Sequence, residues 1–356
     1  MAWGGVEELD VRDKARVRHG RPGDRRPRKR ATRRDVRRRR LATVVALGLL
    51  AGGAVLVTTR GSDSPQATPP ASAAVAARAA RSAGARRPVL HAAAARHVRV
   101  TAPSGGSTSW TTVAWVHGRP AAWIAQRSAV TLMRFDQDLV HLTLHAGSTD
   151  GGVVGWTYGD QISRREIHLV VAAFNGAFRL TYQNVGFMSG GHYAVALKAG
   201  LASLVTYANG RSDIGAWQDG VPGPGAKVFS VLQNQQLLVD HGVAAGTVNG
   251  CVIACWGETI QGLTAVARSG LGITASGQLV WAAGEALSPS GLAGALIGAG
   301  VVRALELDIN PDWVAGYLYV HHASGPAAVP VIPGQLGIAG QLLAPYSRDF
   351  LAVVAN

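Results

Sequence analysis

Short apolar and β-branched runs recur between residues 107 and 354, and they limit the possible folds more than any other feature. Gly, Asn, Asp or Pro follows nearly every run, which is the pattern of strands separated by turns. The runs are Ser128–Arg134, Leu139–His145, Ile167–Ala173, Ala202–Tyr207, Val228–Val231, Leu237–Val239, Gly272–Thr274, Leu279–Ala282 and Ala304–Ile309. Their shortness and spacing predict one strand-rich globular domain over residues 107–354.

One segment, from Ser290 to Gly300, has the features of a helix. Ser288 or Ser290 can cap its start, and Gly298 or Gly300 can end it. A predicted strand stands on either side, which suggests one β-α-β passage. We therefore predict an α+β fold, with a mixed, largely antiparallel sheet and few helices, preceded by one transmembrane helix.

The net charge of +14 is concentrated in the first hundred residues. Residues 1–40 carry 16 Lys and Arg against 6 Asp and Glu, a net of +10. Residues 41–100 add +6, whereas residues 101–356 carry −2. The high isoelectric point therefore gives no reason to expect nucleic acid binding by the folded part. Residues 1–40 hold few large apolar side chains and are predicted to be a disordered tail.

An uncharged run from Leu41 to Thr59 follows four consecutive arginines. Its length is about that needed to cross a hydrocarbon core of roughly 30 Å. Basic residues on its amino-terminal side predict a cytoplasmic amino terminus and an extracellular carboxyl-terminal domain. The rival is a cleaved signal peptide, which usually has a shorter apolar run and a shorter basic region. We expect an uncleaved signal anchor that makes this a single-pass protein of the cell membrane.

The segment between this anchor and the domain, residues 60–106, is rich in Pro, Ala and Arg. This composition is typical of a linker, and the segment has no apolar stripe that would dock on a core. Its arginines could contact anionic lipid or wall polymer outside the membrane.

The predicted strand that begins at Ala304 ends in a group of polar side chains. Successive strand side chains point to opposite faces, so Glu306, Asp308 and Asn310 should share one face. Pro311 cannot donate to a strand ladder and should end the strand. Two carboxylates and an amide at a strand end suggest the floor of a site, although a polar face that meets water has the same pattern.

A divalent cation near Asp308 is a further alternative, with Asn310 as a second ligand, and no other cofactor is indicated. The spacing matches the first ligand positions of an EF-hand loop. An EF-hand is excluded, because Trp313 and Tyr319 replace the glycine and the glutamate which that loop requires.

Two further polar residues stand at predicted strand ends. Asn175 lies in Phe174–Phe178, where Asn-Gly is either a tight turn or a strand end that presents an amide to a ligand. Arg268 begins a predicted β-hairpin with a Ser-Gly turn. An arginine there can clamp an anionic phosphodiester bidentately, or it can be a structural partner of Glu306 or Asp308.

The two cysteines, Cys251 and Cys255, are four positions apart. If the domain lies outside the membrane, the oxidising compartment favours a local disulfide over two free thiols. A metal site made of two cysteines alone is a weaker alternative.

The order of these segments resembles the phosphodiester glycosidase domain family, which includes the enzyme that removes the N-acetylglucosamine covering mannose 6-phosphate. The resemblance rests on His145–Ser148, Phe174–Phe178, Ala202–Val205, Gln233–Asn234, Leu237–Asp240, Arg268–Gly277 and Ala304–Asn310, in this order. It spans nearly all of residues 107–354. It implies an α+β domain that hydrolyses a sugar-1-phosphodiester at the glycosidic bond.

The resemblance also assigns residues by position. The asparagine of the family's FNGGF segment falls on Asn175, the arginine of its RSALGVT-type segment on Arg268, and the aspartate of its LDGGGS segment on Asp308. After Asp308 this chain has Ile309–Asp312 where the family has three glycines and a serine. It shares this LDINP form with a membrane-anchored bacterial branch of the family.

These observations predict a membrane-anchored extracytoplasmic hydrolase of a glycosyl phosphodiester, with a glycosyl-phosphate or envelope glycan as substrate. Asp308 and Glu306 would be the catalytic carboxylates, and Asn175, Arg268 and Asn310 would bind the substrate. The alternative is a non-catalytic envelope glycan-binding module on the same fold. A third hypothesis is an assembly protein whose basic tail recruits cytoplasmic partners. Either ligand-based function requires Asn175, Arg268, Glu306 and Asp308 to meet in one cleft.

Overall fold

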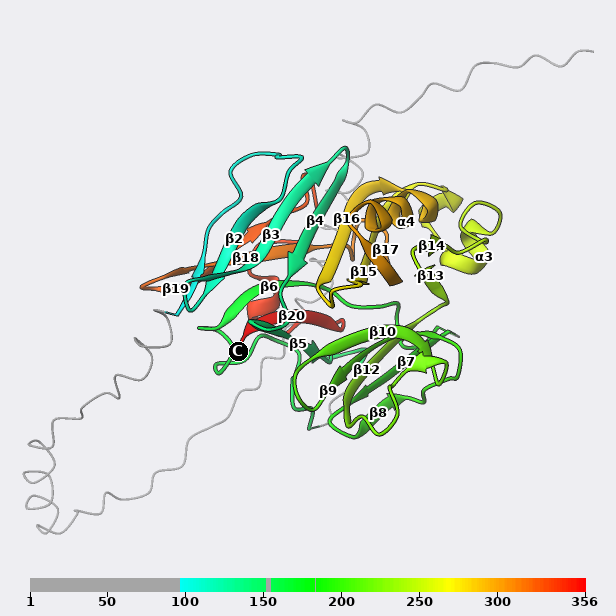
Figure 1. Ribbon diagram of the computed structural model, residues 1–356, viewed down its shortest axis with the longest axis horizontal. Coiled ribbons are helices and arrows are strands. Elements are labelled where there is room, and N and C mark those ends of the chain that lie inside the picture. The colour runs from blue at the N-terminus through cyan, green and yellow to red at the C-terminus, as the bar shows by residue number, and fades with distance from the viewer. Residues whose placement is uncertain (1–96, 152–154, 183) are drawn as a thin grey trace, which may run out of the picture. The chain divides into compact units, whose positions relative to one another are not determined.

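In the computed structural model, which describes residues 97–151, 155–182 and 184–356, the strands form three sheets (Figure 1). Within these residues every strand pair is antiparallel except that of β10 with β11. The helices are few and short: α3 (Val252–Trp256), α4 (Pro289–Gly298) and the 3-10 turns η2 (Ile260–Gly262) and η3 (Gln341–Leu343). The prediction of largely antiparallel sheets with few helices is confirmed.

A nine-stranded sheet carries the predicted hairpin and the predicted β-α-β passage. Its strands, in spatial order, are β1 (Val98–Val100), β2 (Thr111–Val116), β3 (Arg119–Arg127), β4 (Val130–Phe135), β16 (Leu279–Leu287), β15 (Val266–Thr274), β17 (Val301–Ile309), β13 (Leu237–Asp240) and β14 (Val243–Ala244). Because β15 is antiparallel to both neighbours, β16 and β17 run parallel, and α4 connects them across β15. Ser288 caps α4 by accepting from Gly291 N at 3.1 Å, as the sequence predicts.

Two smaller sheets complete the described part of the chain. The six-stranded sheet has the order β11 (Gly220–Val221), β10 (Ser212–Trp217), β9 (Ala202–Tyr207), β12 (Val228–Asn234), β7 (Val185–Ser189) and β8 (His192–Val195). The five-stranded sheet has the order β19 (Gly325–Pro330), β18 (Gly316–His322), β6 (Val170–Asn175), β20 (Phe350–Ala355) and β5 (Val140–His145). Figure 1 shows the five-stranded sheet beside the long strands of the nine-stranded one.

The predicted linker, residues 60–106, overlaps the folded domain at its carboxyl-terminal end. Val98–Val100 form β1, which pairs with β2, and Val98 and Val100 are buried. Alternation of apolar and charged side chains over only three residues is too short a pattern to predict a strand, and pairing with β2 supplies the rest. The folded domain therefore includes residues from Val98 onward.

The predicted basic tail, membrane anchor and remaining linker, residues 1–96, lie outside the described residues. In the part of the chain that is described, none of the helices has the length and apolarity to cross a membrane. The anchor at residues 41–59 therefore stays a prediction.

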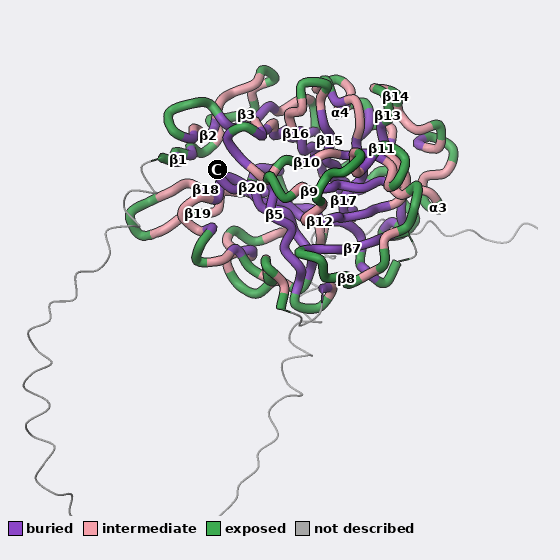
Figure 2. The backbone as a smooth tube through the Cα atoms, turned by 60° about the horizontal axis from the view of Figure 1, so that its bottom comes forward, coloured by how far each residue is buried: buried purple, intermediate pink, exposed green. Residues whose placement is uncertain are grey.

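Apolar side chains from all three sheets form the largest core. Phe174 of β6 stacks on Trp281 of β16, with ring centroids 5.3 Å apart, so the five-stranded and nine-stranded sheets are packed directly together. A second core lies under α4, where Leu292 and Leu296 are fully buried. Figure 2 shows the strands as mainly buried and the connecting loops as mainly exposed.

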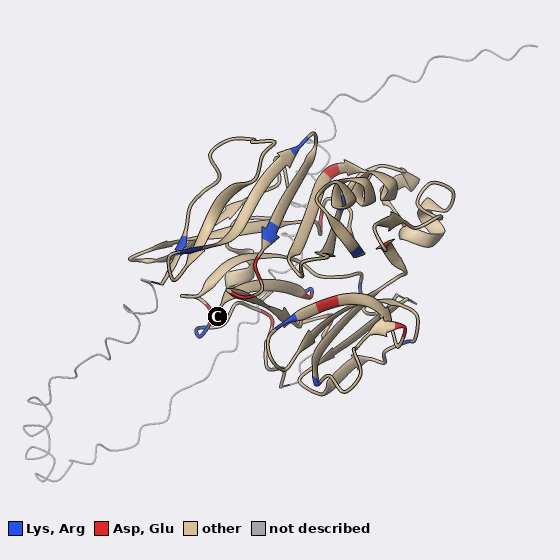
Figure 3. Ribbon diagram, viewed as in Figure 1, with Lys and Arg blue, Asp and Glu red and all other residues tan. Residues whose placement is uncertain are grey.

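Charged residues are scattered along the described strands and loops. Figure 3 shows Lys and Arg mixed with Asp and Glu rather than gathered in one stripe. The few buried charges therefore stand out, and they fall into two groups: one around His145 and Glu166, and one at the end of β17.

The first buried group contains His145, Glu166 and Thr143. The Glu166 carboxylate accepts a hydrogen bond from Thr143 Oγ1 at 2.9 Å and lies 3.1 Å from His145 Nε2. It also accepts from Ser163 N at 2.9 Å. Burial alone would raise the pKa of Glu166, but the contacts with His145 and Ser163 outweigh it and lower the pKa to about 2.

Replacing Glu166 by glutamine should remove a pH-dependent part of the stability. A lowered carboxyl pKa stabilises the fold above the unfolded-state pKa, and this contribution disappears as the pH falls through the folded-state pKa. We expect Glu166→Gln to lower the free energy of unfolding by about 2–3 kcal/mol at pH 7. The difference should shrink as the pH falls from about 4.5 towards 2. Urea unfolding at several pH values measures it, with the exposed Glu258→Gln as control. A difference independent of pH would contradict this account.

Candidate functional site

The ends of three strands meet where the nine-stranded and five-stranded sheets join. Asp308, near the end of β17, donates its N–H to Gly176 O at 2.8 Å. Gly176 follows β6 and donates its own N–H to Asp349 O at 3.1 Å, directly before β20. Phe350 and Asn175 are register partners, so β20 and β6 hold this junction together.

Gly176 is required here by close packing. It is not among the described glycines with positive φ, so a left-handed backbone is not the reason for glycine here. A Cβ at this position would overlap the Asp349 carboxylate and would lie 2.9 Å from the backbone carbonyl oxygen of Asp349. The Asn-Gly pair therefore lets the Asp349 carboxylate lie against the backbone that follows β6.

Asp308 and Arg348 form the centre of the site. Arg348 Nη2 lies 2.7 Å from Asp308 Oδ2 and donates to Ala177 O at 3.1 Å, while Arg348 Nε pairs with Asp150. Asp308 Oδ1 accepts from Ile309 N at 2.9 Å. Both side chains are almost fully buried, so their charges interact with little screening by water.

Three aspartates surround this one arginine, and their charges oppose each other. Burial raises the pKa of Asp308 to about 7, against the effect of Arg348, and Asp349 and Asp150 contribute to the rise. Burial likewise raises the pKa of Asp349 to about 7, although Arg348 and a hydrogen bond from Ala177 N favour its charged form. The cluster can therefore hold a proton near neutral pH, as a general acid must.

A small pocket opens at Asp308. Its volume is about 50 Å³, far below the roughly 300–1,000 Å³ of pockets that enclose a drug-sized ligand. Aromatic, charged and backbone groups share its wall: Phe178, Arg179, Tyr182, Gly257, Glu258, Asp308, Ile309, Asn310, Trp313 and Arg348. Only one polar group of a larger ligand fits inside, and the remainder must lie at the mouth.

Trp313 is flanked by two guanidinium groups. The Cζ atoms of Arg348 and Arg179 lie 4.7 and 5.2 Å from the centre of its ring. Both distances are within the range of cation–π attraction. The pocket therefore presents an aromatic face beside two positive charges, and one of these, Arg179, is exposed.

Arg268 and Glu306 do not line this pocket, which corrects the roles predicted for them. Arg268 Nη1 lies 2.6 Å from Glu306 Oε1, and both side chains are fully buried. Arg268 also donates to Trp256 O at 3.0 Å and to Leu287 O at 3.1 Å. Burial raises the pKa of Glu306, and Arg268 opposes that rise. The pair is structural, which was the alternative that the sequence left open.

The two predicted binding asparagines are also committed to the fold. Asn175 Nδ2 donates to Ser269 Oγ at 2.9 Å, and Asn175 Oδ1 accepts from Ala315 N at 3.3 Å. It lies behind Asp308, since Ser269 Oγ donates to Asp308 O at 3.0 Å. Asn310 does line the pocket, but its Oδ1 accepts from Ile260 N at 3.0 Å. The predicted residues thus cluster around the end of β17, but only Asp308 and Asn310 line the pocket. The expectation that Asn175, Arg268, Glu306 and Asp308 meet in one cleft is therefore wrong, and a ligand site here has to use other residues beside Asp308.

The described residues hold no group of three or more His, Cys, Asp and Glu side chains arranged to bind a metal ion. The Arg348 guanidinium occupies the position next to Asp308 that the sequence left open for a divalent cation.

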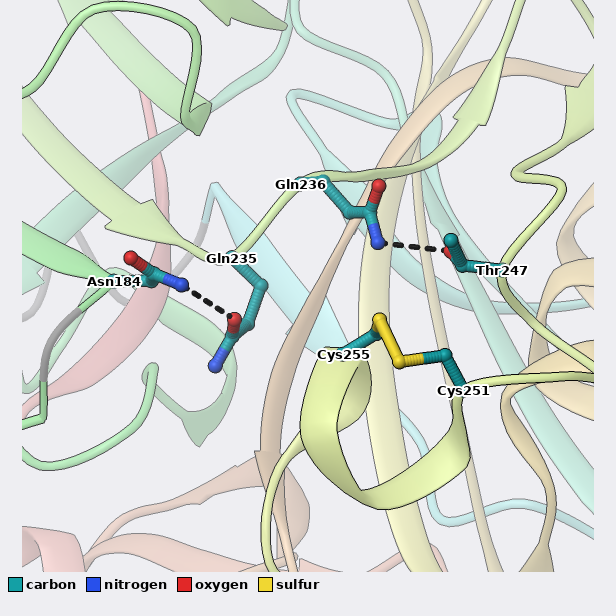
Figure 4. The surroundings of a disulfide bond; sticks show 6 residues. All are labelled: Asn184, Gln235, Gln236, Thr247, Cys251 and Cys255. Atoms are coloured by element: carbon teal, nitrogen blue, oxygen red, sulfur yellow. Dashed lines mark hydrogen bonds between the residues drawn. A yellow bond between two sulfur atoms is a disulfide. The ribbon is translucent and has the colours of Figure 1, made fainter.

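The two cysteines pair as expected. A disulfide joins Cys251 to Cys255, with Cα atoms 5.3 Å apart, and links the start of α3 to its last turn (Figure 4).

Sequence reasoning missed Asp150, Arg348 and Asp349, and the pocket residues Arg179 and Glu258. Arg348 and Asp349 are adjacent and directly precede an apolar run, Phe350–Ala355, which becomes the fully buried β20. Two adjacent, oppositely charged residues directly before a buried strand are the one sequence feature that could have indicated this part of the site. No local pattern connects it with Asp308.

No protein-family model and no curated protein matches the sequence. Among solved structures, the catalytic domain of zebrafish N-acetylglucosamine-1-phosphodiester alpha-N-acetylglucosaminidase, auto-inhibited by its pro-peptide, is similar with a TM-score of 0.41 and 13% identity. That match covers 72% of this chain and 87% of the zebrafish chain. This is a weak similarity of fold.

Two other solved structures show still weaker similarity. A hypothetical protein from Synechocystis has a TM-score of 0.38 and 12% identity, over 72% of this chain and 64% of its own. A putative exported protein from Burkholderia pseudomallei K96243 has a TM-score of 0.30 and 12% identity, over 66% of this chain and 75% of its own.

Proposed function

We propose that this chain is a membrane-anchored extracytoplasmic hydrolase that cleaves the glycosidic bond of a sugar-1-phosphodiester at the Asp308 pocket. The observation that carries the proposal is a buried carboxyl group whose pKa is raised to about 7 and which lines a pocket together with two arginines. Such a group holds a proton at neutral pH and can give it to a leaving oxygen.

The proposed step assigns one role to each pocket residue. Arg179 and Arg348 bind the phosphodiester anion, and the sugar lies against the half-buried Trp313 at the pocket mouth. Asp308 donates its proton to the oxygen between the anomeric carbon and phosphorus as the bond from that carbon to oxygen breaks. The Asp308 carboxylate that results is stabilised by Arg348, 2.7 Å away.

Glu258 takes the place that the sequence assigned to Glu306. It is exposed and lines the same pocket, so it can reach water, whereas Glu306 cannot. In the proposed step Glu258 accepts a proton from the attacking water, and the hydroxyl joins the anomeric carbon. The products are the free sugar and a phosphomonoester. A pair of carboxyl groups with these two roles is the usual arrangement in glycosidases.

The proposal is tested by incubating the full-length protein, in lipid nanodiscs, with the methyl diester of N-acetylglucosamine 1-phosphate in heavy-oxygen water. We expect free N-acetylglucosamine and methyl phosphate, with the heavy oxygen on the sugar. Heavy oxygen on phosphate would show cleavage at phosphorus and contradict the proposal, as would the absence of any turnover.

A non-catalytic glycan-binding module is the second candidate. Two observations favour it. The ion pair with Arg348 favours the charged form of Asp308, which has no proton to donate, and the pocket is small. It predicts saturable binding of an anionic glycan without release of sugar. Arg179→Ala is the variant to measure, because Arg179 is exposed, whereas replacing the buried Arg268 would disturb the fold.

A further inference from the structure

Four exposed apolar side chains lie on segments that form or contact the wall of the Asp308 pocket. Within the described residues, eight large hydrophobic side chains are exposed, and four of them are Tyr182, Ile253, Ile260 and Leu263. Their exposed fractions are 45%, 41%, 41% and 51%. We call these four residues the apolar rim.

The apolar rim is connected to the pocket wall by specific contacts. Tyr182 itself lines the pocket. Ile260 donates its N–H to Asn310 Oδ1 at 3.0 Å, and Asn310 Nδ2 donates to Glu258 O at 3.3 Å. Because Asn310 and Glu258 both line the pocket, the segment that carries Ile260 and Leu263 continues its wall.

Ile253 belongs to the same surface. Its Cδ1 lies 3.9 Å from the position that a Cβ on Gly262 would take, so α3 and the segment around η2 are in contact there. The disulfide joins the two ends of α3 (Figure 4). Trp256, the last residue of α3, is fully buried. These two contacts hold the short helix that carries Ile253.

One residue of η2 has an unfavourable backbone conformation. Gln261, between Ile260 and Gly262, has a φ of 60°. A non-glycine residue in the left-handed region costs on the order of 1–3 kcal/mol. Strained backbone conformations of this kind cluster at active sites and ligand sites.

We propose that the apolar rim binds a hydrocarbon chain esterified to the substrate phosphate, so that the substrate class is a lipid-linked glycosyl phosphodiester. This inference rests on the proposed function. With the phosphate held by Arg179 and Arg348, the pocket of about 50 Å³ has no room for the second ester group. That group must leave through the mouth, where the apolar rim removes its methylenes from water.

The test compares the methyl and hexyl diesters of N-acetylglucosamine 1-phosphate as substrates of the full-length protein in nanodiscs. Burial of one methylene favours binding by about fourfold, so burial of two or three predicts a kcat/KM roughly 15- to 60-fold higher for the hexyl diester. In the double variant Ile260→Ser/Leu263→Ser the ratio should fall to about one, with the methyl diester unaffected.

The control is the double variant Leu336→Ser/Ile338→Ser. These side chains are 52% and 74% exposed but do not line the Asp308 pocket. The control should keep the wild-type ratio. An unchanged ratio in the rim variant, or an equal loss in the control, would overturn the proposal. Reduced binding of the rim variant to phosphatidylglycerol vesicles, with the ratio intact, would assign the rim to the membrane surface and also overturn it.

If neither diester is hydrolysed, the proposed function fails. Calorimetric titration of the same two compounds then tests separately whether the apolar rim binds the hydrocarbon chain. Tighter binding of the hexyl diester, lost in the rim variant, would support the hydrocarbon site. Equal binding of the two diesters would refute it.

Discussion

Replacing Asp308 by asparagine should lower kcat for sugar release by about 10²–10⁴-fold, the usual contribution of a general acid. Asparagine keeps the shape of the side chain but has no proton to give. In the wild type, burial holds the pKa of this carboxyl at about 7, so the protonated, active form predominates below that pH. We therefore expect kcat/KM to decrease as the pH rises through about 7. Initial rates between acidic and mildly basic pH measure both effects.

The matched control for this experiment is Asp312→Asn. Asp312 is exposed, stands four positions further along the chain in the turn that follows β17, and does not line the pocket. Its replacement should leave the rate and the pH profile unchanged. Thermal unfolding of both variants separates loss of the acid from loss of the fold. Full activity in Asp308→Asn would remove Asp308 from its proposed role.

Replacing Arg268 by methionine should destabilise the fold by about 3–5 kcal/mol, because it leaves Glu306 buried without its partner. Both side chains are fully buried, and the two groups are 2.6 Å apart. Arg268→Met also removes the donors to Trp256 O and Leu287 O. The double variant Arg268→Met/Glu306→Met should recover only part of the loss, since those two carbonyls stay unpaired. Urea unfolding at pH 7 measures the changes.

The matched control is Arg211→Met, which breaks an ion pair of similar length at the surface. Arg211 Nη1 lies 2.7 Å from Asp138 Oδ1, with the side chains 47% and 64% exposed. An exposed pair contributes about 0–1 kcal/mol, so the change should be small. Equal losses of unfolding free energy in the Arg268 and Arg211 variants would show that burial does not determine how much these ion pairs contribute to stability.

Several elements could be predicted from the sequence because their signals are local. Ser288 caps α4 through a contact three residues away, and Gly277, with a φ of 82°, allows the tight turn between β15 and β16. The turn residues and the apolar runs between them likewise predicted strands, which the described sheets confirm. Each of these signals involves residues within a few positions of one another, and the backbone responds to them wherever the chain lies.

The same reasoning could not decide which carboxylate faces the pocket. Alternation placed Glu306 and Asp308 on one face of β17, but both faces of that strand are buried from Ala304 to Ile309. The pairing of β17 with β15 shifts between Arg268 and Gly270, and Arg268 then meets Glu306. Periodicity gives the direction of a side chain but not what lies opposite it.

The sequence by itself predicted a strand-rich domain, the cap of α4, the disulfide between the two cysteines and the polar end of β17. Only the tertiary structure placed Asp308 at a pocket and brought Arg348, Asp349 and Asp150 around it. The physical reason is that the pairing of β20 with β6, and the contact of Gly176 with Asp308 and Asp349, join segments far apart in the chain. The raised pKa of Asp308 comes from that assembly, because burial and neighbouring charges exist only once the strands have met.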